Sequence, residues 1–341
     1  MGLNKKLFIQ EAADDANFNI VTYTGTGSIQ SITGVGFQPD LVWIKNRTYT
    51  DQHSLADSVR GGSKWLASDS TQAESTNANA AANSFDSDGF TVSGNYDINR
   101  NNSNFVAWCW KAGGTAVSNT SGSITSSVSA NTAAGFSIVK YTGNGTNGAT
   151  VGHGLSSAPE LIILKNTSSG GASDHWLVGN TQSGWTQAMH LNLTNASATS
   201  NLYWNDTAPT SSVFTLGHHT GVYNANNDEH IAYCWYSVSG HSKIGSYTGN
   251  TSGVTVTTGF QPRWIMIKDT TDNVNHWVIN DAARDISNPR TAVLFPNLSN
   301  AEADNVVFGV NFLSNGFQIP STTTSSAYNK SGNTYIYFAI A

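Results

Sequence analysis

Histidine is the side chain that this sequence places most regularly for chemistry. Single histidines recur after similar apolar runs, and others cluster in the middle of the chain: His53, His175 and His276, then His218, His219 and His230. A transition-metal site needs two or more ligands close together at recognisable spacing, and the recurring histidines come singly. We therefore predict no metal site and interpret the histidines as loop residues, with His175 and His276 stacking on the tryptophans that follow them.

Oxygen ligands for calcium gather late in the first third of the chain, at Asp86, Asp88, Asn95, Asp97 and Asn99. Their spacing lacks the glycine and the closing glutamate of an EF-hand loop. Asp and Asn are also turn formers in their own right. The pattern favours turns, and calcium binding stays open as the alternative.

The familiar catalytic arrangements do not occur. Glycoside hydrolysis needs two carboxyl groups roughly 5–10 Å apart across a cleft, whereas Asp14 and Asp15, like Asp228 and Glu229, are merely adjacent in sequence. No Gly-x-Ser-x-Gly elbow is present, and the glycines at 143–145 are not followed by the Lys-Ser/Thr of a phosphate loop. We predict that the protein is not an enzyme and needs no cofactor.

Four aromatic residues are the better candidates for binding. Trp65, Trp185, Trp204 and Tyr223 lie outside the recurring apolar runs, among Asn, Gln, Ser and Asp residues. Flat rings beside amides and hydroxyls suit sugars, because the rings stack on CH faces while the polar groups hydrogen-bond to hydroxyls. We predict that they bind a ligand; the alternative is that they pack against a neighbouring repeat or subunit.

An internal repeat organises these residues. Tyr-Thr-Gly recurs at residues 23, 141 and 247, with spacings of 118 and 106 residues. Each copy continues with a glycine and proline turn, an apolar run that ends in lysine, one of the recurring histidines and a closing strand rich in aromatic and small residues. The lysines are Lys45, Lys165 and Lys268. We expect their stems to pack and their charged heads to reach solvent.

The elements that position these residues are short strands. The closing runs are β-branched and aromatic, and Gly, Pro and Asn turns divide them. The sequence predicts an all-β fold of three tandem, divergent repeats of about 105 residues, each a β-sandwich or jelly-roll; a three-bladed radial arrangement is the alternative. The predicted division is an N-terminal docking segment (residues 1–17), a first repeat (18–114), a linker (115–133), a second repeat (134–240) and a third repeat (241–341).

The composition of the chain argues against two classes of partner, nucleic acids and membranes. Charged residues make up 11% of the chain and the net charge is −6 with no basic stripe, so we expect no nucleic-acid partner. No apolar run is long enough to span a membrane, and we expect no membrane insertion. The two cysteines, Cys109 and Cys234, occupy equivalent repeat positions. We interpret them as buried free thiols, with one bridge between repeats as the alternative.

The landmarks resemble a repeat module of uncharacterised structural proteins of marine and cyanobacterial tailed bacteriophages, which are tail-fibre-like. The resemblance is carried by five runs: Tyr23–Gly25, Gly34–Pro39, Val42–Lys45, Asp57–Gly61 and Ala107–Gly114. It covers about residues 18–341. The later copies lack the Asp-Ser-Val-Arg-Gly run, so any role of Arg60 is not expected in them.

The resemblance implies a component of the virion surface, made in the host cytoplasm. We expect a tail-fibre or tail-tip protein that contacts other virion proteins and binds a host surface glycan or receptor, with a homotrimer as the expected assembly. The alternative is a capsid decoration protein without a ligand.

Overall fold

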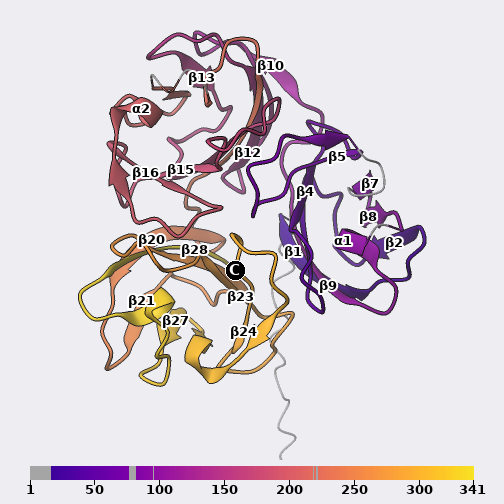
Figure 1. Ribbon diagram of the computed structural model, residues 1–341, viewed down its shortest axis with the longest axis vertical. Coiled ribbons are helices and arrows are strands. Elements are labelled where there is room, and N and C mark those ends of the chain that lie inside the picture. Colours follow the sequence, from indigo (N-terminus) through magenta and orange to yellow (C-terminus); the bar gives the residue numbers. More distant parts are fainter. Residues whose placement is uncertain (1–16, 77–81, 95, 218, 220–221) are drawn as a thin grey trace, which may run out of the picture.

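The computed structural model describes residues 17–76, 82–94, 96–217, 219 and 222–341. Antiparallel strands dominate it, which confirms the predicted all-β class. In Figure 1 the strands gather in three regions around a common centre. We call them the first, second and third regions, over residues 17–114, 115–240 and 241–341.

Each region is built on one main sheet. The first main sheet has the strand order β1-β9-β3-β4, and the third has the order β20-β28-β22-β23. Their bounds are β1 (Phe18–Thr24), β9 (Asn104–Trp110), β3 (Leu41–Asn46), β4 (Ser54–Asp57), β20 (Ser242–Thr248), β28 (Thr334–Ile340), β22 (Trp264–Asp269) and β23 (Val278–Asp281).

The second main sheet is longer but contains the same arrangement. Its order is β10-β11-β12-β19-β14-β15-β16-β17, in which β12-β19-β14-β15 match the four strands of the other two sheets. The bounds are β10 (Val117–Asn119), β11 (Ser126–Asn131), β12 (Phe136–Thr142), β19 (Glu229–Trp235), β14 (Leu161–Asn166), β15 (Leu177–Asn180), β16 (Gln187–His190) and β17 (Ala198–Thr199). A recurring order of this kind is what divergent copies of one unit would produce.

The register of the strands recurs as well. In each main sheet the first residue of the outer strand faces the last residue of the central strand: Phe18 and Trp110, Phe136 and Trp235, Ser242 and Ile340. Equivalent positions can therefore be compared residue by residue among the three regions.

The Tyr-Thr-Gly landmark has the same structural role three times. The tyrosine ring stacks on the ring across the ladder, with centroids 4.8–5.1 Å apart: Tyr23 on Phe105, Tyr141 on His230 and Tyr247 on Tyr335. Its hydroxyl donates to a backbone carbonyl: that of Ile98, Tyr223 or Tyr328. The glycine is needed because a Cβ there would lie within 2.3 Å of a backbone oxygen in all three copies.

A second layer of strands covers the outer face of each main sheet, so each region is sandwich-like. The layers are β2 (Gln30–Thr33), β8 (Gly89–Val92) and β7 (Ala82–Asp86) in the first region, β13 (Thr150–Gly152) and β18 (Val213–Thr215) in the second, and β21 (Val254–Thr257), β27 (Gly316–Ile319) and β26 (Asn311–Leu313) in the third. The smaller elements are β5 (Lys64–Trp65), β6 (Ser75–Thr76), β24 (Ala292–Val293), β25 (Ala303–Asp304), α1 (Tyr96–Asn99), α2 (Asn201–Trp204), α3 (Ser326–Asn329) and the 3-10 turn η1 (Val306–Phe308).

The inner faces of the three main sheets share one apolar core. Side chains alternate along a strand, so Trp108 and Trp110 of β9 face this central core while Ala107 and Cys109 face the outer layer of their own region. The central core includes residues of all three regions, among them Trp43, Trp176, Trp235, Trp264 and Trp277. The main sheets are therefore covered on both faces, as their continuously apolar runs require.

The structure bears on three further predictions: the linker, the N-terminal docking segment and membrane insertion. Residues 115–133 are more than the predicted linker, because β10 and β11 add two antiparallel strands to the edge of β12. The predicted docking segment lies outside the described residues, apart from Asn17. Within the described ranges, no helix is long and apolar enough to cross a membrane.

Candidate functional site

The aromatic residues singled out for ligand binding are buried. Trp65, Trp185, Trp204 and Tyr223 expose only 9%, 7%, 0% and 2% of their surfaces. Trp65 packs in the outer core of the first region, and the other three pack in the outer core of the second. The structure corrects the prediction, because rings without an exposed face cannot stack on a sugar.

Local packing explains the burial of this cluster. Trp185 and Trp204 meet edge to face, with centroids 5.3 Å apart and planes at 89°. Both rings lie against Gly179 in β15, where a Cβ would come within 2.5 Å of either ring. The rings pack into the outer cores although their neighbours in sequence are polar. Sequence neighbours gave no information about the direction in which the rings point.

His53 illustrates what the recurring histidines do. Its Nδ1 accepts a hydrogen bond of 2.9 Å from Trp43 Nε1, so Nε2 carries the ring proton and donates to the carbonyl of Phe295 at 3.0 Å. The ring is fully buried. Burial, assisted by the charge of Lys45, lowers the pKa of His53 well below its ordinary value. The contact between the first and third regions therefore uses the neutral form of the His53 ring.

The other two recurring histidines do not stack on the tryptophans that follow them. His175 and His276 each accept at Nδ1 from an asparagine amide, Asn192 and Asn297, at 2.9 and 2.7 Å. Among the described residues, no group of three His, Cys, Asp or Glu side chains could hold a metal ion. His218 lies outside the described residues.

The oxygen ligands proposed for calcium are used in turns where they are described. Asp86 accepts from two hydroxyls, Asp88 from two backbone amides between β2 and β3, and Asn99 from the backbone amide of residue 26. Burial raises the pKa of Asp97, which opposes the charged form that a cation needs. Asn95 lies outside the described residues.

The adjacent acids do not form a catalytic pair across a cleft. Asp228 accepts from a side-chain amide of β14 at 2.8 Å, and Glu229 forms an ion pair with Lys140 at 2.8 Å. Asp14 and Asp15 lie outside the described residues.

The recurring lysines differ from the prediction most sharply. Lys45, Lys165 and Lys268 are fully buried, head included. Each Nζ donates to the carbonyl of the next residue in its own strand and to a carbonyl of a neighbouring region: Ser299 O at 3.0 Å, Thr71 O at 3.1 Å and Thr194 O at 3.0 Å. Burial lowers the pKa of all three lysines to about 8.

These lysine contacts run in one direction around a ring, from the first region to the third, from the third to the second, and from the second to the first. A ring nitrogen in each copy follows the same circuit: His53 Nε2 to Phe295 O, Trp277 Nε1 to His190 O and Trp176 Nε1 to Ala67 O. Backbone hydrogen bonds link the same pairs of regions in the opposite direction: Glu302 N donates to Arg47 O, Ser197 N to Thr270 O and Glu74 N to Thr167 O. The chain therefore forms a closed, threefold-like ring.

Two of the three junctions also contain a buried ion pair. The pairs are Asp57 with Arg60 and Asp281 with Arg284, both at 2.5 Å. The hydroxyl of Tyr233 donates to the first aspartate at 2.8 Å, and the indole of Trp108 donates to the second at 3.0 Å. The role of Arg60 is thus repeated by Arg284 in the third region, contrary to expectation. The spacing Asp-x-x-Arg was the signal that could have shown it.

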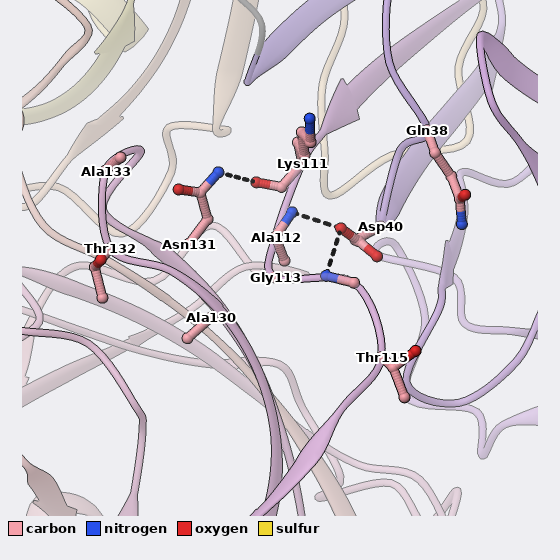
Figure 2. Close-up of a pocket in the computed structure, with 11 residues that line it drawn as sticks. Gln38, Asp40, Lys111, Ala112, Gly113, Thr115, Ala130, Asn131, Thr132 and Ala133 are labelled. Atoms are coloured by element: carbon pink, nitrogen blue, oxygen red, sulfur yellow. Dashed lines mark hydrogen bonds between the residues drawn. The ribbon is translucent and has the colours of Figure 1, made fainter.

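A surface hollow lies where the first region passes into the second. It has a volume of about 560 Å³ and is lined by Lys111–Thr115 on one side, by residues 130–133 on another and by Gln38 and Asp40. Figure 2 shows Asn131 and Thr132 on one wall and Gln38 and Thr115 on the other. An adjoining hollow of about 480 Å³ shares Gln38, Asp40, Gly114 and Thr115 with it. We call the two hollows together the trough.

Asp40 shapes the trough but is not free to react. Its carboxylate is buried and accepts from the backbone amides of Ala112 and Gly114 at 2.8 and 3.3 Å (Figure 2). It also accepts from the hydroxyl of Ser58 at 2.7 Å. It therefore fixes the turn that leaves β9. Of the residues that the structure describes, no second carboxylate lines the trough. The site can offer hydrogen bonds to a ligand, but it lacks the acid pair that glycoside hydrolysis requires.

Comparison with known proteins adds a family. Residues 14–341 match the model of a domain of unknown function (DUF7483). No curated protein and no solved structure shows significant similarity to the chain.

Proposed function

The chain belongs to the DUF7483 family, and we propose that it is a non-enzymatic structural protein on the surface of a bacteriophage virion. The resemblance of its repeat landmarks to phage structural proteins supports this assignment. The single observation that carries it is the closed ring of contacts, in which three alike main sheets share one central core. A body of this kind suits a load-bearing building block that presents loops to its surroundings.

The use of the ionisable residues supports the same proposal. The recurring lysines, the buried histidine of the first region and the two aspartate–arginine pairs all serve internal contacts. A catalytic site needs ionisable groups that reach a substrate. Here the three recurring lysines and His53, whose pKa values are lowered, are buried and donate to backbone carbonyls.

Within the virion we propose a place in the tail fibre or tail tip, with binding of a host surface glycan or receptor. The four aromatic residues no longer support this part, since they are buried. It is supported instead by the polar trough and by exposed hydroxyl and amide side chains along it. Other virion proteins would be its permanent partners, and a homotrimer its assembly.

A capsid decoration protein is the second candidate, and one observation favours it. The chain presents three alike regions around one centre (Figure 1), so a single monomer could occupy a threefold position of a shell. Mass measurement by light scattering separates the two candidates: a trimer supports the fibre, and a monomer supports the decoration protein.

Immunogold labelling of intact virions with antibody to the purified chain tests the proposal. Gold at the tail would support the receptor-binding role, and gold spread over the head would leave the decoration protein. If antibody that recognises the chain in solution labels no part of the virion, the structural assignment is wrong.

A further inference from the structure

We propose that the trough is a carbohydrate-binding site and that its ligand is a neutral saccharide chain. This inference rests on the proposed receptor-binding function and specifies its ligand class and contact residues. Four features of the trough support it: its origin, the chemistry of its walls, its charge and its shape.

One wall of the trough comes from a hairpin that the third region lacks. The hairpin of β10 and β11 extends the second main sheet, whereas β20 is at the edge of the third sheet with no such hairpin before it. Residues 130–133, at the end of that hairpin, form one wall of the trough. In repeat architectures, an insertion confined to one repeat often builds the binding face. The threefold ring needs no such wall, so the hairpin is available for another purpose.

The walls offer groups that match sugar hydroxyls. Gln38, Thr115 and Thr132 are exposed, and their amide and hydroxyl groups can both donate and accept hydrogen bonds. Gly114 carries no side chain, and no atom lies within 4 Å of the place where its Cβ would be, so the backbone is open to the trough at this position. A polyhydroxylated ligand can therefore approach the backbone closely.

The charges on the walls favour a neutral ligand. Lys111 is the only cation among the described residues of the lining, and its Nζ lies 6.0 Å from the centre of the Phe37 ring. The carboxylate of Asp40 lines the same hollow but is already hydrogen-bonded to backbone amides. Within the described part of the lining, one positive and one negative group give no excess charge to attract an acidic polymer.

The shape and one ring favour a chain over a single sugar. The two hollows share a wall and follow one another along residues 111–116. Phe85, in β7, is half-buried and lines the second hollow. Its exposed part can stack on the CH face of a pyranose, which is the role that the four buried aromatics cannot take.

The test is binding of the full chain to an array of neutral and acidic oligosaccharides. The variant Thr115→Trp fills the trough from an exposed position, and Gln38→Ala removes one amide. Gln261→Ala is the matched control, because Gln261 holds the equivalent position in the third region and lies outside the trough. We expect wild type to bind neutral chains, Thr115→Trp to bind at least about tenfold more weakly, Gln38→Ala about fivefold more weakly, and Gln261→Ala equally well.

Thermal unfolding of each variant shows that its fold is intact. Binding to acidic chains alone would overturn the neutral ligand class. Binding that survives Thr115→Trp, or that is lost in Gln261→Ala, would overturn the site, and the absence of any bound saccharide would overturn the inference as a whole. Immunogold labelling judges the virion assignment separately: virions that carry Thr115→Trp should keep their label and lose adsorption to the host.

Discussion

The hydroxyl of Tyr233 in β19 donates a hydrogen bond of 2.8 Å to Asp57 at the end of β4, across the junction of the second and first regions. At the next junction Trp108 in β9 donates in the same way to Asp281. The equivalent position in β28 is Phe338, which has no donor. At this third junction Asn180 takes the place of the aspartate, and a small apolar cavity lies beside Asn180 and Phe338. The ring donor and the acid are therefore present together or absent together.

The buried ion pair predicts a large effect of Arg60→Met. Arg60 and Asp57 are both fully buried at the side chain, and removing one partner leaves an uncompensated buried carboxylate. We expect the free energy of unfolding in urea to fall by about 3–5 kcal/mol. Lys64→Met is the control: Lys64 pairs with Glu74 in the same cluster but is 30% exposed, so its loss should cost under about 1 kcal/mol. Equal losses in the two variants would contradict the role of burial.

The buried lysines predict a pH dependence above neutrality. Lys268 donates to three carbonyls, and burial lowers its pKa from 10.5 to about 8. Between these two values the unfolded chain binds more protons than the folded chain, so stability rises with pH. The stability difference between wild type and Lys268→Met should grow by about 1.4 kcal/mol per pH unit from pH 8, and should stay constant below it.

Urea unfolding at several pH values measures this difference. Lys330→Met is the control, because Lys330 is 53% exposed. If the stability difference between wild type and Lys268→Met falls as pH rises, the folded state does not disfavour the ammonium form of Lys268.

His53 predicts sensitivity to acid. Its Nδ1 must remain unprotonated to accept from Trp43, and its pKa is lowered well below 6.5. Below pH 6.5 the unfolded chain takes up a proton that the folded chain refuses, so stability should fall by about 1.4 kcal/mol per pH unit from this group. His53→Gln can keep both hydrogen bonds without titrating.

Urea unfolding at pH 7.5 and pH 5 compares the two proteins. We expect His53→Gln to lose less stability than wild type between these values. His241→Gln, at a partly exposed position, should lose as much as wild type; an equal loss in all three proteins would remove His53 from the explanation.

The corrected aromatic cluster gives a stability prediction in place of a binding one. Trp204 is fully buried against Trp185 and Gly179, so Trp204→Ala should cost about 3–5 kcal/mol in the free energy of unfolding. Leu202, two residues earlier in the same short helix, is 42% exposed, and Leu202→Ala should cost well under half as much. A Trp204→Ala protein of unchanged stability that fails to adsorb to cells would restore the binding interpretation.

The cysteines should be inert in the folded protein. Cys109 and Cys234 are free and fully buried, as the sequence predicted, and burial raises the pKa of both thiols. A thiol reagent should titrate no group in the native protein and two groups in urea. A native protein that reacts at once would show that one of the central strands opens readily.

Sequence alone was sufficient for the features that depend on local pattern. Apolar runs of strand length and Gly, Pro and Asn turns determined the all-β class, because β-branched and aromatic runs bounded by turn residues favour strands. The Tyr-Thr-Gly landmark was found without knowing its cause, which is a stacked ring, a hydroxyl held by a carbonyl and a glycine with no room for a Cβ.

Only the tertiary structure decided where side chains point and which region they meet. Trp204 was expected at the surface because its sequence neighbours are polar, and Lys268 was expected to reach solvent because lysine usually does; both are fully buried. The physical reason is that each lies where one element packs against another that is distant in the chain. The carbonyl that receives Lys268 belongs to Thr194 in a different region, and no local pattern encodes that meeting.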